Sequence, residues 1–270
     1  MWILFFSFVL VGAVTDDCEV ESLVQVKSQE IRARHCEELA KDDCSFHHEK
    51  GGIFKCGFEH ASRLMYITWF RPDAKVLEIG ARYGQTGCLL STILQREAGA
   101  ELVSADADPN VWDVLEGNFK QHKCWGKVVR GPVGTNPVKI KRVHSYGTQT
   151  GSVEDRGEGV IVPATPLESL NTTFDTLSVD CEGCFSTFLE ENPQLLESLT
   201  MIMAEVHNDQ EEATVQRLLA EGWELKQQLL MQRVLCKGSC NRYCDEKWVV
   251  QHAAAYWPKQ SFKMGVHTTG

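Results

Sequence analysis

The sequence has few basic residues, no internal repeats and no apolar run long enough to cross a membrane. Its 27 Lys and Arg stand against 37 Asp and Glu, so the formal net charge is −10 and the chain would repel a phosphate backbone. We therefore expect no nucleic-acid partner. A chain of 270 residues with 43% hydrophobic residues can bury a large core, and this length suits one large domain better than two.

The longest N-terminal apolar run, residues 1–14, is too short to span a bilayer comfortably but has the length of a signal-peptide core. Small residues suit cleavage after Ala13. We therefore expect residues 1–13 to be a signal peptide and the protein to enter the secretory pathway lumen or the extracellular space. No Lys or Arg precedes the run, so a short membrane anchor and part of a longer targeting signal stay open as alternatives.

Cysteine is abundant, with 11 residues, and together with an export signal this number indicates disulfide bonds. Four cysteines lie before the first predicted strand of the sheet: Cys18, Cys36, Cys44 and Cys56. Four more fall in the predicted core, at Cys88, Cys124, Cys181 and Cys184, and three lie near the C-terminus, at Cys236, Cys240 and Cys244. The odd total implies a free thiol or an intermolecular bond. The spacing of the last three matches neither zinc pairs nor common iron–sulfur runs, so we favour disulfides and predict no metal site.

The hydrophobic pattern changes along the chain from a helix-prone extension to alternating strands and helices. Residues 14–60 are charged and bear several cysteines, which predicts a small helical extension before one domain over residues 61–270. In that domain the pattern predicts strands at residues 75–80, 101–105, 128–129, 176–180 and 201–205, with helices between most of them. This alternation predicts a doubly wound, mostly parallel, Rossmann-like α/β sheet.

Two segments interrupt this alternation. Residues 134–159 are rich in Gly, Ser, Thr and charge, and a segment of this kind inside an α/β enzyme is typically a lid or a small hairpin insertion. Residues 223–235 and 248–256 predict a closing antiparallel hairpin, with the loop from Cys236 to Cys244 between its arms.

A glycine-rich turn between the first strand and the next helix is the strongest chemical signal. Gly80 and Gly84 allow a tight turn and close approach of a ligand, and the helix start presents unpaired N–H groups. Arg82 interrupts the Gly-x-Gly-x-x-Gly pattern of dinucleotide sites, which argues against that ligand. Asp106 ends the next strand, where a carboxylate can bind ribose hydroxyls, and Asp108 could substitute for it. A plain tight connection between strand and helix is the structural alternative.

Asp180, Glu182, Glu205 and His207 form the second candidate site, because they follow two predicted strands whose C-terminal ends would face a ligand. Residues two apart in extended chain point the same way, so two of these carboxylates could face one site, with one pKa raised toward that of a general base. The alternatives are structural roles: His207 could be a packed or capped histidine, Glu205 could make only structural hydrogen bonds, and Asp180 could only brace the neighbouring loop.

Together these motifs resemble the FkbM-type branch of the class I S-adenosylmethionine-dependent methyltransferases. The segments that carry the resemblance cover about residues 70–235 in the family's order: 76–84 (VLEIGARYG), 103–109 (VSADADP), 165–170 (TPLESL), 174–183 (FDTLSVDCEG) and 201–207 (MIMAEVH). The resemblance implies S-adenosylmethionine as cofactor. It also implies O-methylation of a sugar hydroxyl or a small hydroxylated metabolite, without identifying the acceptor.

The resemblance also implies roles for single residues. Gly80 and Gly84 would lie against the methionine part of the cofactor, Glu78 would orient its amino group, and Asp106 would hold the ribose. The segment from Asp180 to Gly183 would face the transferred methyl. Two rival hypotheses stay open at this point: a secreted, disulfide-stapled binding module that has the fold without turnover, and a nicotinamide-dependent oxidoreductase.

Overall fold

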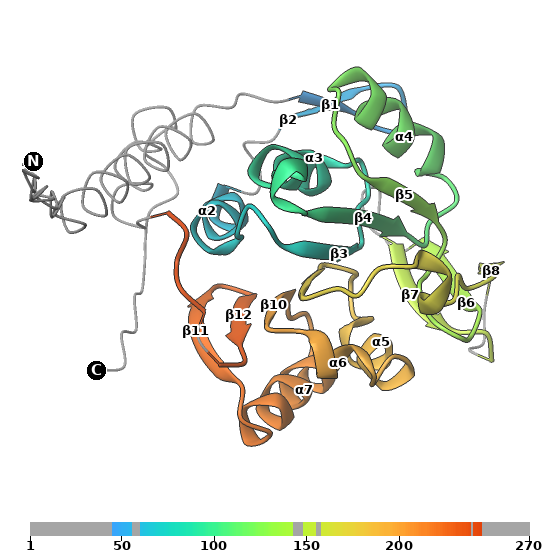
Figure 1. Ribbon diagram of the computed structural model, residues 1–270. Helices are drawn as coiled ribbons and strands as arrows, with labels where there is room; N and C mark the ends of the chain where they lie inside the picture. The colour runs from blue at the N-terminus through green and yellow to red at the C-terminus, as the bar shows by residue number, and fades with distance from the viewer. Residues whose placement is uncertain (1–44, 56–59, 143–147, 155–157, 239, 245–270) are drawn as a thin grey trace, which may run out of the picture.

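A computed structural model describes residues 45–55, 60–142, 148–154, 158–238 and 240–244. Its centre is a seven-stranded sheet in the order β11-β12-β10-β9-β3-β4-β5 (Figure 1). The strands are β3 (Lys75–Ile79), β4 (Glu101–Asp106), β5 (Lys127–Arg130), β9 (Thr176–Val179), β10 (Met201–Glu205), β11 (Glu224–Leu229) and β12 (Gln232–Cys236). Strands β5, β4, β3, β9 and β10 are parallel, whereas β12 runs antiparallel to both of its neighbours. The fold is therefore the expected doubly wound, mostly parallel, Rossmann-like sheet with a C-terminal antiparallel hairpin.

Helices cover both faces of this sheet (Figure 1). One face carries α2 (His60–Trp69), α3 (Gln85–Ile93) and α4 (Trp112–Gln121), and the other carries α5 (Phe185–Glu191), α6 (Leu195–Ser198) and α7 (Asp209–Ala220). Successive strand residues point to opposite faces, so Val76 packs in the core of α2 and α3 while Leu77 packs in that of α5 and α7. None of the helices in the described parts of the chain combines the length and the apolar character of a membrane span.

The C-terminal hairpin lies earlier in the chain than the sequence pattern predicts. Residues 223–235, expected to form one arm, contain β11 and all of β12 except its last residue, because the chain reverses at Leu230 and Met231. Leu230 adopts φ 51, a conformation in which Gly or Asn is usual, so the turn carried no sequence signal. The predicted second arm, residues 248–256, lies outside the described residues.

The described part of the N-terminal extension is also different from the prediction. Residues 45–55 form an antiparallel hairpin of β1 (Ser45–His47) and β2 (Ile53–Lys55), so the prediction of helix is wrong there. The hairpin is anchored by long-range contacts that a local pattern does not contain. Phe46 is buried and stacks on His122, with ring centroids 4.4 Å apart, and the Asn118 amide of α4 donates to the His47 carbonyl at 2.9 Å. Residues 14–44, with the proposed signal before them, lie outside the described part.

The segment between β5 and β9 contains a small separate sheet. Strands β6 (Val138–Arg142), β7 (Thr148–Ser152) and β8 (Val160–Val162) pair antiparallel in the order β7-β6-β8. The predicted insertion over residues 134–159 thus contains the β6–β7 hairpin, and β8 just after it completes a three-stranded antiparallel unit beside the C-terminal ends of the main strands (Figure 1).

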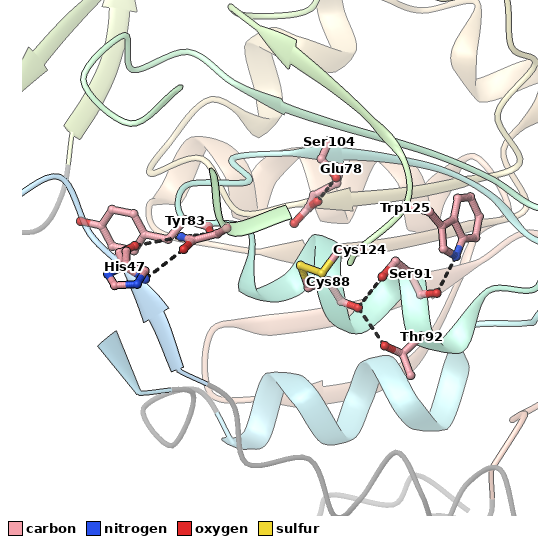
Figure 2. The surroundings of a disulfide bond; sticks show 10 residues. His47, Glu78, Tyr83, Cys88, Ser91, Thr92, Ser104, Cys124 and Trp125 are labelled. Atoms are coloured by element: carbon pink, nitrogen blue, oxygen red, sulfur yellow. Dashed lines mark hydrogen bonds between the residues drawn. A yellow bond between two sulfur atoms is a disulfide. The ribbon is translucent and has the colours of Figure 1, made fainter. Parts of the chain in front are cut away.

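Three disulfide bonds join described cysteines. Cys88–Cys124 ties α3 to the segment after α4, as Figure 2 shows, and Cys181–Cys184 closes the turn after β9. Cys236–Cys240 closes the start of the C-terminal loop, in agreement with the preference for disulfides over a metal there. The four cysteines of the N-terminal extension lie outside the described residues: Cys18, Cys36, Cys44 and Cys56.

Candidate functional site

A large cavity lies where the strand order reverses, between β3 and β9. Strands β4 and β5 follow β3 toward one edge of the sheet, whereas β9 and β10 lie on the other side of β3. Open α/β sheets bind ligands beyond the carboxyl ends of their strands at such a point. The cavity has a volume of about 910 Å³ and is walled by strand ends of the main sheet, by the β6–β7 hairpin and by the turn between β11 and β12. Its size suits a cofactor together with a small acceptor.

The glycine turn after β3 brings two strand ends into contact. Gly80 has φ 90, and a Cβ at this position would lie 1.7 Å from the carbonyl oxygen of Asp180. The Asp180 N–H donates to the Ile79 carbonyl at 2.9 Å. Gly80 is therefore required for the close approach of the turn to the segment after β9, and both residues line the cavity.

Asp106, at the end of β4, lines the same cavity and is held by backbone donors. Its Oδ2 accepts the Arg82 N–H at 2.7 Å, and its Oδ1 accepts the Asp108 N–H at 2.8 Å. Burial raises the pKa of Asp106 to about 6, although these hydrogen bonds oppose the shift. Each carboxylate oxygen keeps a further acceptor position, so the group can still accept hydrogen bonds from a ligand.

Asp108 is more fully engaged within the protein than Asp106. Its Oδ1 accepts both the backbone N–H of Asn110, at 2.9 Å, and that residue's side-chain amide, at 2.7 Å. Its Oδ2 lies 3.5 Å from Nη1 of Arg82. Both acids line the cavity, but the geometry favours Asp106 as the ligand-binding carboxylate and Asp108 as the residue that shapes the turn before α4.

Glu78 and Gly84, both predicted to contact the cofactor, are not among the residues that line the cavity. The Glu78 carboxylate is buried and accepts the hydroxyl of Ser104 on the neighbouring strand (Figure 2). A Cβ at Gly84 would lie 2.8 Å from the ring of Phe119, so this glycine allows α3 and α4 to pack closely. Contact of either residue with the cofactor stays a prediction.

The buried Glu78 makes the stability of the protein dependent on pH. Burial raises its pKa from 4.5 to about 7. The folded state therefore favours the neutral acid, and the stability that this form contributes is complete below pH 4.5 and is lost as pH rises through about 7. We expect the free energy of unfolding of the wild type to fall by about 2 kcal/mol more than that of Glu78→Gln between about pH 5 and 8. Denaturant titrations across this range would measure it, and parallel pH profiles of the two proteins would contradict it.

The structure brings the four predicted catalytic residues together at the ends of β9 and β10. Nε2 of His207 lies 3.8 Å from Oδ1 of Asp180, 3.6 Å from Oε2 of Glu182 and 3.6 Å from Oε1 of Glu205. All four residues line the cavity. We call Asp180, Glu182, Glu205 and His207 the acid–histidine cluster. Glu182 is the most exposed of them, with a side chain 52% accessible, whereas those of Glu205 and His207 are 17% and 16% accessible.

Two residues that the sequence patterns did not single out support the acid–histidine cluster. The Glu211 carboxylate is fully buried and lies 3.6 Å from Nδ1 of His207, and Gln232 Nε2 donates to Glu205 Oε2 at 2.6 Å. Burial lowers the pKa of His207, but the carboxylate of Glu211 and then those of Glu182 and Glu205 outweigh it, so its pKa is raised. Glu211 occupies the third position of α7 after the N-cap Asn208, a spacing that signals a helix start and not a functional site.

No protein-family model matches the chain, and no curated protein matches it. Among solved structures, precorrin-6y C5,15-methyltransferase from Geobacter metallireducens is 12% identical over 62% of this chain and 79% of that chain, with a TM-score of 0.40. Aeropyrum pernix fibrillarin with bound S-adenosyl-L-methionine is 9% identical over 72% and 81%, with a TM-score of 0.42. An O-methyltransferase from Bacillus cereus is 12% identical over 84% and 94%, with a TM-score of 0.38. A likeness at these values carries no function over to this chain.

Proposed function

We propose that this chain is an S-adenosylmethionine-dependent methyltransferase that acts on a hydroxyl of a small molecule or a glycan. The observation that carries the proposal is the composition of one cavity. A glycine turn and the buried carboxylate of Asp106 form one part of its wall, and the acid–histidine cluster forms another. A cofactor and an acceptor can therefore lie side by side between the two parts.

The residues at the end of β3 and β4 fit the cofactor. Gly80 presents backbone without a side chain, and Gln85 and Thr86 line the cavity from the first turn of α3. Asp106 would accept the ribose hydroxyls through its remaining acceptor positions. The carboxylates of Asp180 and Glu205 give the adjoining part of the wall negative charge, which suits a sulfonium cation.

The acid–histidine cluster would remove the acceptor proton. When bound, S-adenosylmethionine supplies an activated methyl, which an acceptor oxygen takes while the S–CH₃ bonding pair returns to sulfur. Alignment of the acceptor and capture of its proton are then what the protein must add. Asp180 follows β9 directly beside Gly80, so its carboxylate is our first candidate for the proton acceptor, and the remaining members of the cluster would orient the hydroxyl.

The most direct experiment incubates the purified protein with S-adenosylmethionine labelled in its methyl group and an extract of its source. We expect label in a hydroxylated small molecule or glycan, as a methyl ether. Labelled product that carries the methyl on nitrogen or carbon would contradict the acceptor class. Binding of the cofactor without transfer to any component would instead favour a binding module.

Asp106→Ala tests the cofactor part of the proposal. We expect this variant to fold and to bind S-adenosylmethionine more weakly by about 1.5 to 3 kcal/mol, as is typical for loss of hydrogen bonds to a charged group. Titration calorimetry on both proteins measures the change. Asp108→Ala is the matched comparison, and a larger loss there would move the ribose contact to Asp108.

We also propose that the protein matures in an oxidising compartment, which the disulfides of the described residues support. Secreted protein should begin near Val14 or Asp16 if the signal is cleaved after residue 13 or shortly beyond. Intact mass spectrometry after alkylation, with and without prior reduction, would test both points. An intact Met1 together with 11 thiols that alkylate without reduction would contradict the proposal.

A further inference from the structure

The acid–histidine cluster contains a set of atoms suited to a metal ion. Asp180, Glu205 and His207 each offer one ligand atom, and these atoms all lie within 4.8 Å of one another. They come from the ends of two adjacent strands, β9 and β10, and face the same cavity. One imidazole nitrogen and two carboxylate oxygens that converge in this way resemble the donor sets of catalytic metal sites, which keep open positions for a substrate.

Several carboxylates lie close together around the imidazole of His207. Four carboxylates surround one imidazole, since Asp180, Glu182, Glu205 and Glu211 all lie within 4.0 Å of a His207 ring nitrogen. Carboxylates so close to one another repel each other, and a divalent cation bound among them would offset that repulsion.

The residues that hold His207 and Glu205 in place are arranged like the residues that orient the ligands of metal sites. The two Glu211 oxygens accept the backbone N–H groups of Phe185, at 2.9 Å, and His207, at 2.7 Å, so this carboxylate is fixed while it faces Nδ1 of the same ring. Nε2 is thereby turned toward the cavity. Gln232 fixes one oxygen of Glu205 and leaves the other for the cavity. Carboxylates behind a ligating histidine and hydrogen bonds to a ligating carboxylate orient the ligands of metal sites in this way.

We propose that Asp180, Glu205 and His207 bind one divalent cation, which holds the acceptor hydroxyl beside the cofactor and favours loss of its proton. The role toward the acceptor rests on the proposed methyltransferase function, whereas the cation site does not. An oxygen-rich set with one imidazole suits Mn²⁺. With Asp180 bound to the cation, Glu182, which lies beside the same ring nitrogen and is more exposed, would take the proton from the acceptor in place of Asp180.

Binding of Mn²⁺ alone tests the site without reference to activity. We expect electron paramagnetic resonance of the metal-free full chain titrated with Mn²⁺ to show one bound ion per chain. Glu205→Gln and His207→Ala should each weaken that binding at least about tenfold, the range seen when groups that support a metal are removed. Glu191→Gln is the control, because Glu191 is a carboxylate of the same cavity whose side chain bonds Asn136 and not the acid–histidine cluster. Melting temperatures of the variants would show whether each has folded.

The outcomes separate this inference from the proposed function. Absence of stoichiometric Mn²⁺ binding, or equal binding by folded wild type, Glu205→Gln and His207→Ala, would overturn the cation site. Methyl transfer that persists in excess chelator would leave the proposed function intact and remove the cation from it. Stoichiometric Mn²⁺ binding that depends on Glu205 and His207, in a protein with no affinity for S-adenosylmethionine, would support the site and reject the proposed function.

Discussion

Asp180→Asn is expected to lower turnover at least about 100-fold, while affinity for S-adenosylmethionine changes much less. The substitution keeps the size of the side chain but removes its charge and its basicity. The residue lies at the end of β9, where its carboxylate is 3.8 Å from Nε2 of His207 and its backbone touches the glycine turn. The loss should therefore appear in the rate of methyl transfer, whether the carboxylate acts on the acceptor proton or through a bound cation.

Single-turnover kinetics with labelled cofactor, together with calorimetry, would separate transfer from binding. Glu190→Gln is a suitable control, since it removes one carboxylate from exposed α5 surface outside the cavity. A purely structural role for Asp180 predicts that activity and melting temperature fall together. Full activity of Asp180→Asn would end its assignment to the reaction.

Gly80→Ala is expected to destabilise the fold by more than about 4 kcal/mol, which few single substitutions do. An added Cβ would lie 1.7 Å from the Asp180 carbonyl oxygen, and both groups belong to backbone directly after the paired strands β3 and β9. Neither segment can move without disturbing the pairing of β3 with β9. The positive φ of 90 adds a smaller cost, because side chains are strained in that conformation.

Gly99→Ala provides the matched control for this prediction. Gly99 has nearly the same φ, 85, but nothing lies within 4 Å of the position its Cβ would take. Its replacement should cost only about 1 kcal/mol, the strain of the backbone alone. Chemical denaturation of both variants would isolate the effect of the close approach. Similar losses at the two positions would show that the contact between the two strand ends is not tight.

Local sequence patterns predicted the members of the acid–histidine cluster but not every property of the site. Asp180 and Glu205 were predicted to meet because each ends an apolar run, and parallel strands end at one edge of a sheet. A metal site at these residues was not predicted, because Asp180 and Glu205 lie 25 residues apart in the chain, as 205 − 180 gives. Metal-site patterns read from sequence depend on short spacings, which this site does not have.

The sequence by itself determined the class of fold, because apolar runs that end in Gly or Asp and alternate with helical periods specify buried parallel strands with crossover helices. It also indicated Gly80, Asp106 and Asp180 as residues of one ligand-binding edge. Only the tertiary structure decided the position of the C-terminal hairpin, the β-hairpin of residues 45–55 and the support that Glu211 and Gln232 give to the acid–histidine cluster. The physical reason is that these features depend on contacts between segments far apart in the chain, as when Asn118 holds the hairpin of residues 45–55, and a local pattern carries no information on such contacts.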